Sequence, residues 1–247
     1  MLTNETVEFL PASNGNPLVH PQWSPDGKWL KYYEVAYIEG LGVLHTWEVG
    51  TGKLVNWVDL GADIFPGFSS WASDGTRIIF DVVSYTGFPG AGIYQANPDG
   101  SDIQLIFSRS NRVATKPSLS PLRDRVAFLL SEYGQATNTL VVTDLAGESA
   151  QEIVSSEAGL AGLDWSPAGS QLLFALPSGE AADLVVFNVD TGDQTVIAQA
   201  KPQQVDWGPY SAGSTTREAL SPQTIPEVSY KPNLLIYLAE DYRLVLL

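Results

Sequence analysis

Short runs of hydrophobic and aromatic residues recur along the whole chain, and each run is bounded by Gly, Pro, Asp or Ser. Short length, β-branched and aromatic residues, and turn residues at both ends are typical of β-strands. No segment of about 12 residues or more shows the periodicity of an amphipathic helix. In four successive units the pattern predicts three strands each, over Trp29–Val35, Val43–Val49 and Leu54–Leu60; Arg77–Val83, Gly92–Ala96 and Ile103–Phe107; Arg125–Leu130, Thr139–Leu145 and Gln151–Val154; and Gln171–Leu176, Asp183–Val189 and Gln194–Ala198.

A short anchor sequence precedes each unit. The anchors begin 48, 48, 46 and 42 positions apart, at Trp23, Trp71, Leu119, Trp165 and Trp207. In the fullest form, Trp-Ser-Pro-Asp-Gly, the Pro presets φ for a turn, the Asp accepts backbone N–H groups and the Gly tolerates positive φ. The Trp supplies a large apolar plate between neighbouring units. We therefore interpret the anchor residues as structural, namely Trp23, Asp26, Trp71, Asp74, Trp165 and Trp207.

Each anchor also ends a short strand of its own, so that every unit has four strands. Four-stranded units that repeat every 40–50 residues or so are the blades of a β-propeller. The chain is thus predicted to be all-β, with a single propeller domain over residues 1–247. Its blades are expected at about 17–60, 64–108, 113–155, 160–199 and 202–247.

Closure of the ring involves both ends of the chain. The fifth blade offers three strands, over Gln203–Trp207, Leu234–Leu238 and Arg243–Leu247. The N-terminal segment Thr6–Leu10 supplies a fourth, outer strand, and five closed blades then account for the whole chain. The alternative is a fragment of a six- or seven-bladed propeller, which the apolar C-terminal residues suit equally.

These repeats resemble the TolB-type, WD40-like (PD40) propeller family. The resemblance is carried by the Trp-Ser-Pro-Asp-Gly anchor before an apolar strand, and by the Ile-Tyr strand that leads to an Asn-Pro-Asp-Gly turn. It covers about residues 17–209, and the third anchor departs from it at Leu119. The resemblance implies the fold without a single activity, because relatives include periplasmic and secreted scaffolds, lipoprotein partners and the propellers of prolyl peptidases.

Composition narrows the classes of partner. The chain has 247 residues, with 13 basic and 28 acidic side chains and a net charge of −15, so it repels nucleic acid. It has no Cys, which excludes disulfides, thiolate nucleophiles and Cys-based zinc sites. No apolar run approaches the roughly 18–20 residues that cross a bilayer, so we expect no membrane insertion. Acidic charge, absent Cys and the resemblance suit an extracytoplasmic protein, periplasmic or secreted, although each also suits a cytoplasmic one.

The sequence gives little support to a metal site or a catalytic Ser-His-Asp triad. The two histidines, His20 and His45, both lie in the first unit, and no Gly-x-Ser-x-Gly elbow occurs. We expect a turn or packing role for His20 and an exposed or half-buried strand position for His45. No metal or other cofactor is expected, and a non-catalytic protein is favoured.

The alternative is a carbohydrate-active enzyme, which needs two carboxylates at a suitable separation. Asp164 and Asp206 each precede an anchor Trp on the innermost strands of adjacent blades. They belong to a candidate polar layer near the axis whose other members are Gln22, Ser70 and Ser118. The competing interpretation is that the aspartates bond backbone groups between blades. A third acid, Asp81, is expected to end a strand at the surface.

One face of the propeller has the composition of a binding surface. Loops between the second and third strands of each blade emerge there together with the segments between blades. The segment after the second blade holds three of the 13 basic residues within eight positions, and such a cluster attracts carboxylate or phosphate groups even in an acidic protein. Aromatic loop tips beside Arg are typical of interfaces, although the basic residues also have neighbouring acids to pair with. We predict that a protein, peptide or glycan binds through Tyr37, Tyr85, Phe88, Arg109, Arg112, Lys116 and Tyr133.

Overall fold

The computed structural model describes residues 8–9, 16–35, 42–57, 66–83, 90–122, 124–132, 134–200, 236–238 and 244–246. These residues form β-strands and the turns between them, in agreement with the predicted all-β class. In the described part of the chain no helix is long and apolar enough to span a membrane.

Four antiparallel sheets of four strands each follow one another along the chain, and we number them as blades 1 to 4. Within each blade the strands pair in chain order, so every blade is a meander. The strands are β2 (Leu18–Trp23), β3 (Trp29–Val35), β4 (Gly42–Glu48) and β5 (Leu54–Asn56) in blade 1; β6 (Pro66–Trp71), β7 (Ile78–Val82), β8 (Gly92–Ala96) and β9 (Gln104–Phe107) in blade 2; β10 (Arg112–Leu119), β11 (Arg125–Glu132), β12 (Asn138–Asp144) and β13 (Gln151–Ser156) in blade 3; and β14 (Ala161–Trp165), β15 (Gln171–Ser178), β16 (Ala181–Asn188) and β17 (Gln194–Ala200) in blade 4.

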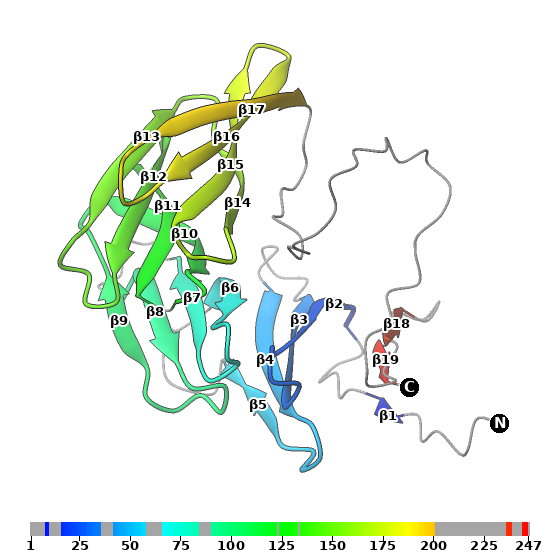
Figure 1. Ribbon diagram of the computed structural model, residues 1–247. Coiled ribbons are helices and arrows are strands. Elements are labelled where there is room, and N and C mark those ends of the chain that lie inside the picture. Colours follow the sequence, from blue (N-terminus) through cyan, green and yellow to red (C-terminus); the bar gives the residue numbers. More distant parts are fainter. Residues whose placement is uncertain are drawn as a thin grey trace, which may run out of the picture.

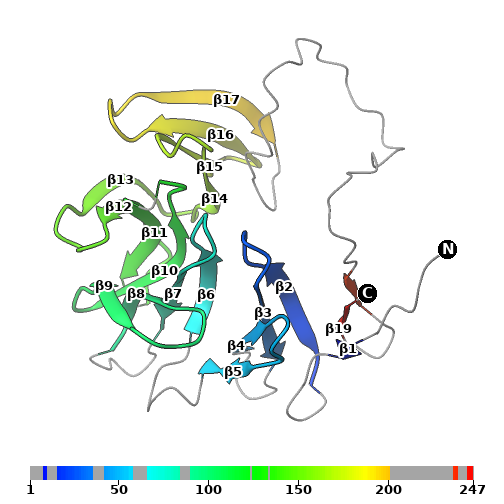
Figure 2. The same cartoon turned by 60° about the horizontal axis from the view of Figure 1, so that its bottom comes forward.

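The four blades are arranged about a common centre (Figures 1 and 2). Figure 2 shows the first strand of each blade, β2, β6, β10 or β14, towards this centre, and the last strand, β5, β9, β13 or β17, on the outside. Each innermost strand ends at its anchor residue, as the repeat predicts. The loops that join second to third strands therefore emerge on the same side as the segments between blades.

A further sheet joins the two ends of the chain. Strand β19 (Leu244–Leu246) pairs with β18 (Ile236–Leu238) on one side and with the N-terminal β1 (Glu8–Phe9) on the other. This pairing of the N-terminal segment with the last strand is the one expected for ring closure. The strand expected at 203–207 lies outside the described residues, and the count of five blades stays a prediction.

Apolar side chains fill the spaces between blades. Ile79 and Ile93 of blade 2 pack with Val126 and Phe128 of blade 3 in one cluster. A second cluster joins blades 3 and 4, and a third joins blades 1 and 2. Neighbouring blades thus bury the facing sides of their small sheets against each other, as in other repeat architectures.

The anchors form tight turns and also connect blades. The Gly27 N–H donates to the Ser24 carbonyl (2.9 Å), and Gly27 has the positive φ, +70°, that favours glycine. The indole N–H of Trp71 donates to the Gln22 carbonyl of blade 1 (3.2 Å). Trp165 makes the equivalent bond to the Ser118 carbonyl of blade 3 (3.0 Å). Each of these indoles thus holds its blade to the innermost strand of the preceding blade.

Candidate functional site

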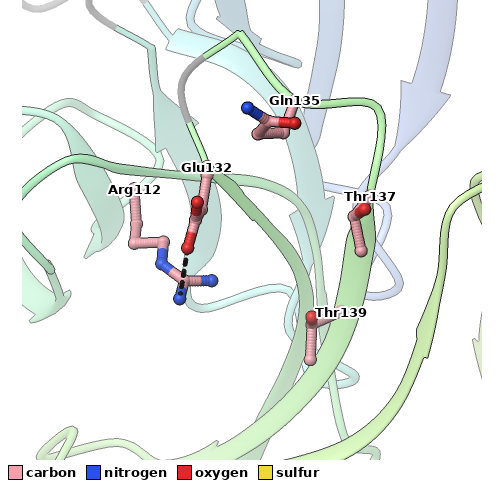
Figure 3. Close-up of a pocket in the computed structure, with 5 residues that line it drawn as sticks. All are labelled: Arg112, Glu132, Gln135, Thr137 and Thr139. Atoms are coloured by element: carbon pink, nitrogen blue, oxygen red, sulfur yellow. Dashed lines mark ion pairs between the residues drawn. The ribbon is translucent and has the colours of Figure 1, made fainter.

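A small polar pocket opens on the face that carries the interblade segments (Figure 3). Arg112 begins β10 and faces Glu132 at the end of the neighbouring strand β11, whereas the other lining residues follow in the next loop and in β12. The pocket has a volume of about 230 Å³ and is lined by Arg112, Glu132, Gln135, Thr137 and Thr139. The structure therefore brings the predicted basic segment and the loop between β11 and β12 together at one site.

Both arginines of the predicted binding face have acidic partners. Arg112 lies 2.9 Å from the Glu132 carboxylate, and Arg109 lies 3.0 Å from that of Glu152. This is the pairing that the competing interpretation expected. The Arg109 side chain nevertheless keeps 45% of its surface exposed, and its partner 52%. Lys116 is also exposed, with its Nζ 5.4 Å from the centre of the Phe68 ring. The predicted aromatic residues lie outside the described residues, namely Tyr37, Tyr85, Phe88 and Tyr133.

The candidate polar layer near the axis is present in part. Gln22, Ser70, Ser118 and Asp164 occupy the same register position in their four blades. The Asp164 carboxylate accepts the N–H of the next residue, Trp165 (2.9 Å). Asp206 and the anchor Trp207 lie outside the described residues. Across the described ranges, no group of three or more His, Asp and Glu side chains is arranged to hold a metal ion.

Asp81 corrects one prediction, because it is fully buried in β7 and does not lie at the surface. Its carboxylate accepts the Phe68 N–H of its own blade (2.9 Å) and the Lys116 N–H of blade 3 (2.8 Å). Both donors lie where the innermost strands bulge and leave backbone N–H groups without a ladder partner. A Cβ at Gly67 would press on the Asp81 carboxylate, which would have to shift from its present hydrogen bonds. Burial raises the pKa of Asp81 to about 7, against the lowering effect of these hydrogen bonds.

His45 corrects a second prediction, because it is only 2% exposed. Its Nε2 lies 3.2 Å from the Glu34 carboxylate, and its ring stacks on that of Tyr32 at 5.2 Å. The register of β4 places His45 where blade 3 has Val141, so this is a core position of the repeat. The alternation of polar and apolar residues within one strand does not reveal whether the face that carries a polar residue is buried.

Sequence reasoning missed a polar cluster between blades 1 and 2. The Lys31 side chain, 3% exposed, crosses to β6, where its Nζ bonds to the Ser69 carbonyl (2.5 Å) and lies 2.9 Å from Ser69 Oγ. The hydroxyl of Tyr33 lies 2.7 Å from the same Oγ. Burial lowers the pKa of Lys31 to about 7. Alignment of the four second strands on their anchors would have revealed Lys31 at a position that is apolar in the other blades.

Comparison with known proteins gives a consistent result. No family model matches the chain. Tol-Pal system protein TolB from Haemophilus ducreyi is 24% identical over 151 residues, which are 59% of this chain and 35% of the relative. The solved structure assigned to TolB of Agrobacterium tumefaciens superposes with a TM-score of 0.56 at 16% identity, over 72% of this chain and 63% of that one. The fold is a TolB-like β-propeller.

A second TolB structure supports the same fold. TolB from Acinetobacter baumannii gives a TM-score of 0.50 at 17% identity and covers 73% of this chain and 43% of that one. The chain thus spans about a third of the TolB sequence it matches. On this TolB-like propeller the polar pocket lies on the face of the interblade segments, whereas the Lys31 cluster lies inside the ring between two blades.

Proposed function

We propose that this TolB-like propeller binds a protein partner through the face that carries the polar pocket, Arg109, Arg112 and Lys116. The observation that carries the proposal is the pocket itself, in which Arg112 and the loop after β11 meet. The relative named as a protein of the Tol-Pal system is the basis for preferring a protein over a glycan. An extracytoplasmic location is part of the same proposal.

The size of the pocket favours one anchoring side chain over a small-molecule ligand. Its volume of about 230 Å³ is below the 300–1,000 Å³ or so of typical small-molecule sites. Interfaces commonly place a single side chain in such a recess, with polar contacts around it. Thr137 and Gln135 offer a hydroxyl and an amide group for those contacts, whereas the Thr139 hydroxyl lies 2.8 Å from Ser155 Oγ.

The charge pattern favours an acidic residue on the partner. Exposed ion pairs are worth only about 0–1 kcal/mol, so Arg109 and Arg112 exchange their own Glu partners for an incoming carboxylate at little cost. Arg binds a carboxylate through two parallel hydrogen bonds, which also fixes its orientation. Aromatic side chains at Tyr37, Tyr85, Phe88 and Tyr133 would add apolar contacts around this polar centre.

Charge reversal on two opposite faces tests the proposal. The wild-type chain is used to retain proteins from an extract of the source cells, in parallel with an Arg109→Glu/Arg112→Glu/Lys116→Glu variant. We expect the variant to lose a partner that the wild type retains, by about tenfold or more, since 1.4 kcal/mol is tenfold in affinity. Quantitative mass spectrometry of the retained proteins measures the loss.

A matched control changes the net charge by the same amount elsewhere. Lys28, Lys53 and Arg77 lie beside the turns on the opposite face, and their reversal to Glu should leave the partner bound. Equal loss in both triple variants would attribute binding to net charge and contradict the proposed face. The carbohydrate-active alternative predicts hydrolysis of glycosides that an Asp164→Asn/Asp206→Asn variant lacks. Only Asp164 of that pair belongs to the described residues, so no carboxylate separation supports it.

A further inference from the structure

Three departures from the repeat meet at one point between blades 1 and 2. The register of the second strands places Lys31 where the other blades have Ile79, Ala127 and Leu173. Counted from the anchors, Tyr33 stands where blades 3 and 4 have Leu129 and Ala175, and Ser69 where the other innermost strands have Pro21, Pro117 and Leu163. Lys31 and Ser69 each replace an inert residue with one that carries chemistry, and at the position of Tyr33 blade 2 also has a polar residue, Asp81.

The three side chains form a connected hydrogen-bonded group. Ser69 Oγ lies 2.9 Å from Lys31 Nζ and 2.7 Å from the Tyr33 hydroxyl, and Lys31 Nζ also bonds to the Ser69 carbonyl. Lys31 is almost fully buried, whereas Ser69 is half-buried on the innermost strand. A buried base beside a more accessible hydroxyl is the arrangement that an activated serine requires.

We propose that Ser69 is a nucleophile for acyl transfer from small activated esters, with Lys31 as its general base and Tyr33 as a positioning hydrogen-bond donor. In this arrangement Tyr33 donates to Ser69 Oγ, which donates its own proton to the neutral amine of Lys31. One N–H of that amine donates to the Ser69 carbonyl and holds the amine in place. The proposal is independent of the partner-binding face.

The reaction balances without any added cofactor. Ser69 Oγ forms a bond to the acyl carbon, its proton passes to Lys31 Nζ, and the ester C–O bond breaks. Lys31 then gives that proton to the departing alkoxide, which leaves as an alcohol. Water attacks the acyl-serine in the second half, with Lys31 taking its proton and returning it to Ser69 Oγ as the acid is released.

The surroundings favour the protonation states that this chemistry needs. Burial lowers the pKa of Lys31 to about 7, so a large share of the amine is neutral near neutral pH. No carboxylate of the described residues forms an ion pair with Lys31 that would keep it charged. Burial also raises the pKa of Tyr33, helped by the nearby charge of Asp81, and the phenol stays protonated as a donor. Asp81, whose charge acts on Tyr33, also accepts the backbone N–H of Lys116 on β10.

Covalent labelling of the wild-type chain tests the proposal directly. The protein is incubated with p-nitrophenyl acetate and, separately, with a fluorophosphonate, and the modified peptide is identified by mass spectrometry. We expect one adduct on Ser69 and none on Ser178, which is more exposed but has no such base. The labelling rate should rise with pH through about 7, as Lys31 loses its proton.

Variants separate catalysis from packing. Lys31→Leu installs the residue of blade 4, so the fold should persist while labelling of Ser69 slows by about 100-fold or more, the usual size of a general-base contribution. Tyr33→Phe should slow it less, and Ser178→Ala should leave it unchanged. Absence of a Ser69 adduct in the folded wild type, or equal rates in wild type and Lys31→Leu, would overturn the proposal.

Discussion

Two interfaces of the same propeller solve the same packing problem differently. Between blades 3 and 4, Ala127 and Leu129 of β11 pack with Leu172 and Phe174 of β15 in an apolar cluster. Between blades 1 and 2, the position of Ala127 is taken by Lys31, which bonds to β6. The repeat therefore requires a filled space at this position, and either a hydrocarbon or a fully bonded polar side chain fills it.

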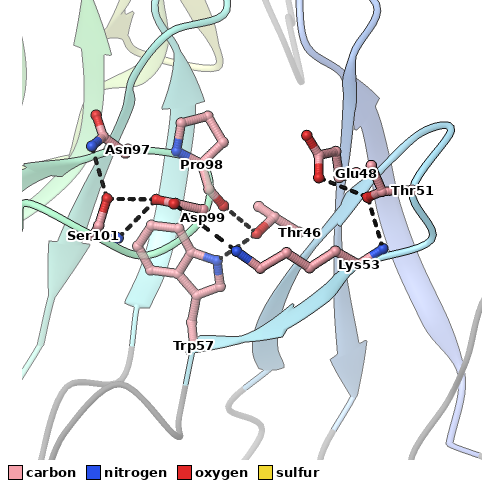
Figure 4. A network of polar contacts seen from close by, with 9 residues as sticks. All are labelled: Thr46, Glu48, Thr51, Lys53, Trp57, Asn97, Pro98, Asp99 and Ser101. Carbon is pink, nitrogen blue, oxygen red and sulfur yellow. Dashed lines mark hydrogen bonds and ion pairs between the residues drawn. The ribbon is translucent and has the colours of Figure 1, made fainter.

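Polar contacts also join blades 1 and 2 beside their apolar cluster (Figure 4). The indole N–H of Trp57 donates to Thr46 Oγ1 (3.0 Å), whose hydroxyl donates to the Pro98 carbonyl of blade 2 (2.6 Å). Lys53 reaches Asp99 across the same interface at 4.0 Å. When one partner of a buried hydrogen bond is removed, the other is left unsatisfied and the protein loses stability. Such bonds therefore select one arrangement of blades 1 and 2, without making this interface more stable than an apolar one.

The largest effect is expected in the apolar cluster between blades 3 and 4. Phe174 is 1% exposed in the cluster between blades 3 and 4. Replacing it with Ala removes a ring and leaves a cavity, and we expect the free energy of unfolding to fall by roughly 3–5 kcal/mol. Urea denaturation measures the change. A loss below about 1 kcal/mol would mean that this interface is not close-packed.

An increase in the free energy of unfolding is expected at the equivalent position between blades 1 and 2. Lys31→Leu removes a buried amine that pairs with no carboxylate of the described residues. Even buried ion pairs are often replaced by apolar residues with a gain of roughly 1–4 kcal/mol, so we expect the free energy of unfolding to rise by about that amount at pH 6. The folded pKa is about 7 and the unfolded value 10.5, so between these values the unfolded chain binds the extra proton. The penalty in the wild type is therefore complete below pH 7 and is lost as the pH rises to 10.5.

Unfolding free energies of both proteins at pH 6, 8 and 10 check this dependence. The advantage of the Leu variant should shrink steadily along the series. A difference that does not change with pH would show that Lys31 keeps an ordinary pKa, and would weaken its assignment as a base.

An intermediate loss is expected where a carboxylate joins two blades. Asp81→Asn keeps the shape but cannot accept both the Phe68 and Lys116 N–H groups, so we expect a loss of about 1–3 kcal/mol near pH 5. The folded pKa is raised from 3.8 to about 7, so the folded wild type binds the extra proton between these values. Its advantage over Asn should narrow as the pH rises from 4 to 7, as measured by thermal unfolding. If the difference between wild type and Asn instead grew with pH, the pKa of Asp81 would be lowered on folding and not raised.

The smallest effect is expected from a single hydrogen bond of an anchor. Trp165→Phe keeps most of the apolar plate and removes the indole N–H that donates to the Ser118 carbonyl. We expect a loss of about 1 kcal/mol from the bond, with a further contribution from the smaller ring. Trp71→Phe should lose a similar amount through the Gln22 carbonyl. Very different values in calorimetry would show that the two indoles are not equivalent.

Local chemistry explains why so much of the fold was predictable. Strands β3 and β8 have the predicted bounds, and the anchors form the expected turns, because alternation, Pro and Gly act within a few residues. The grouping of Arg109 and Arg112 with the loop after β11 follows from strand order alone. Asp81 and His45 were predicted wrongly because their burial depends on neighbours far away in the sequence.

The sequence by itself determined the repeat, the four-stranded blades, the negative net charge and the cluster of basic residues at 109–116, of which Arg112 and Lys116 lie in β10. Only the tertiary structure decided which polar residues are covered and what they contact. Ser69 lies 38 residues from Lys31, and Lys116 lies 35 residues from Asp81, yet each pair meets across a blade interface. Such contacts form because the innermost strands bulge and expose backbone groups that must find partners, and no local pattern in the chain records which side chain supplies them.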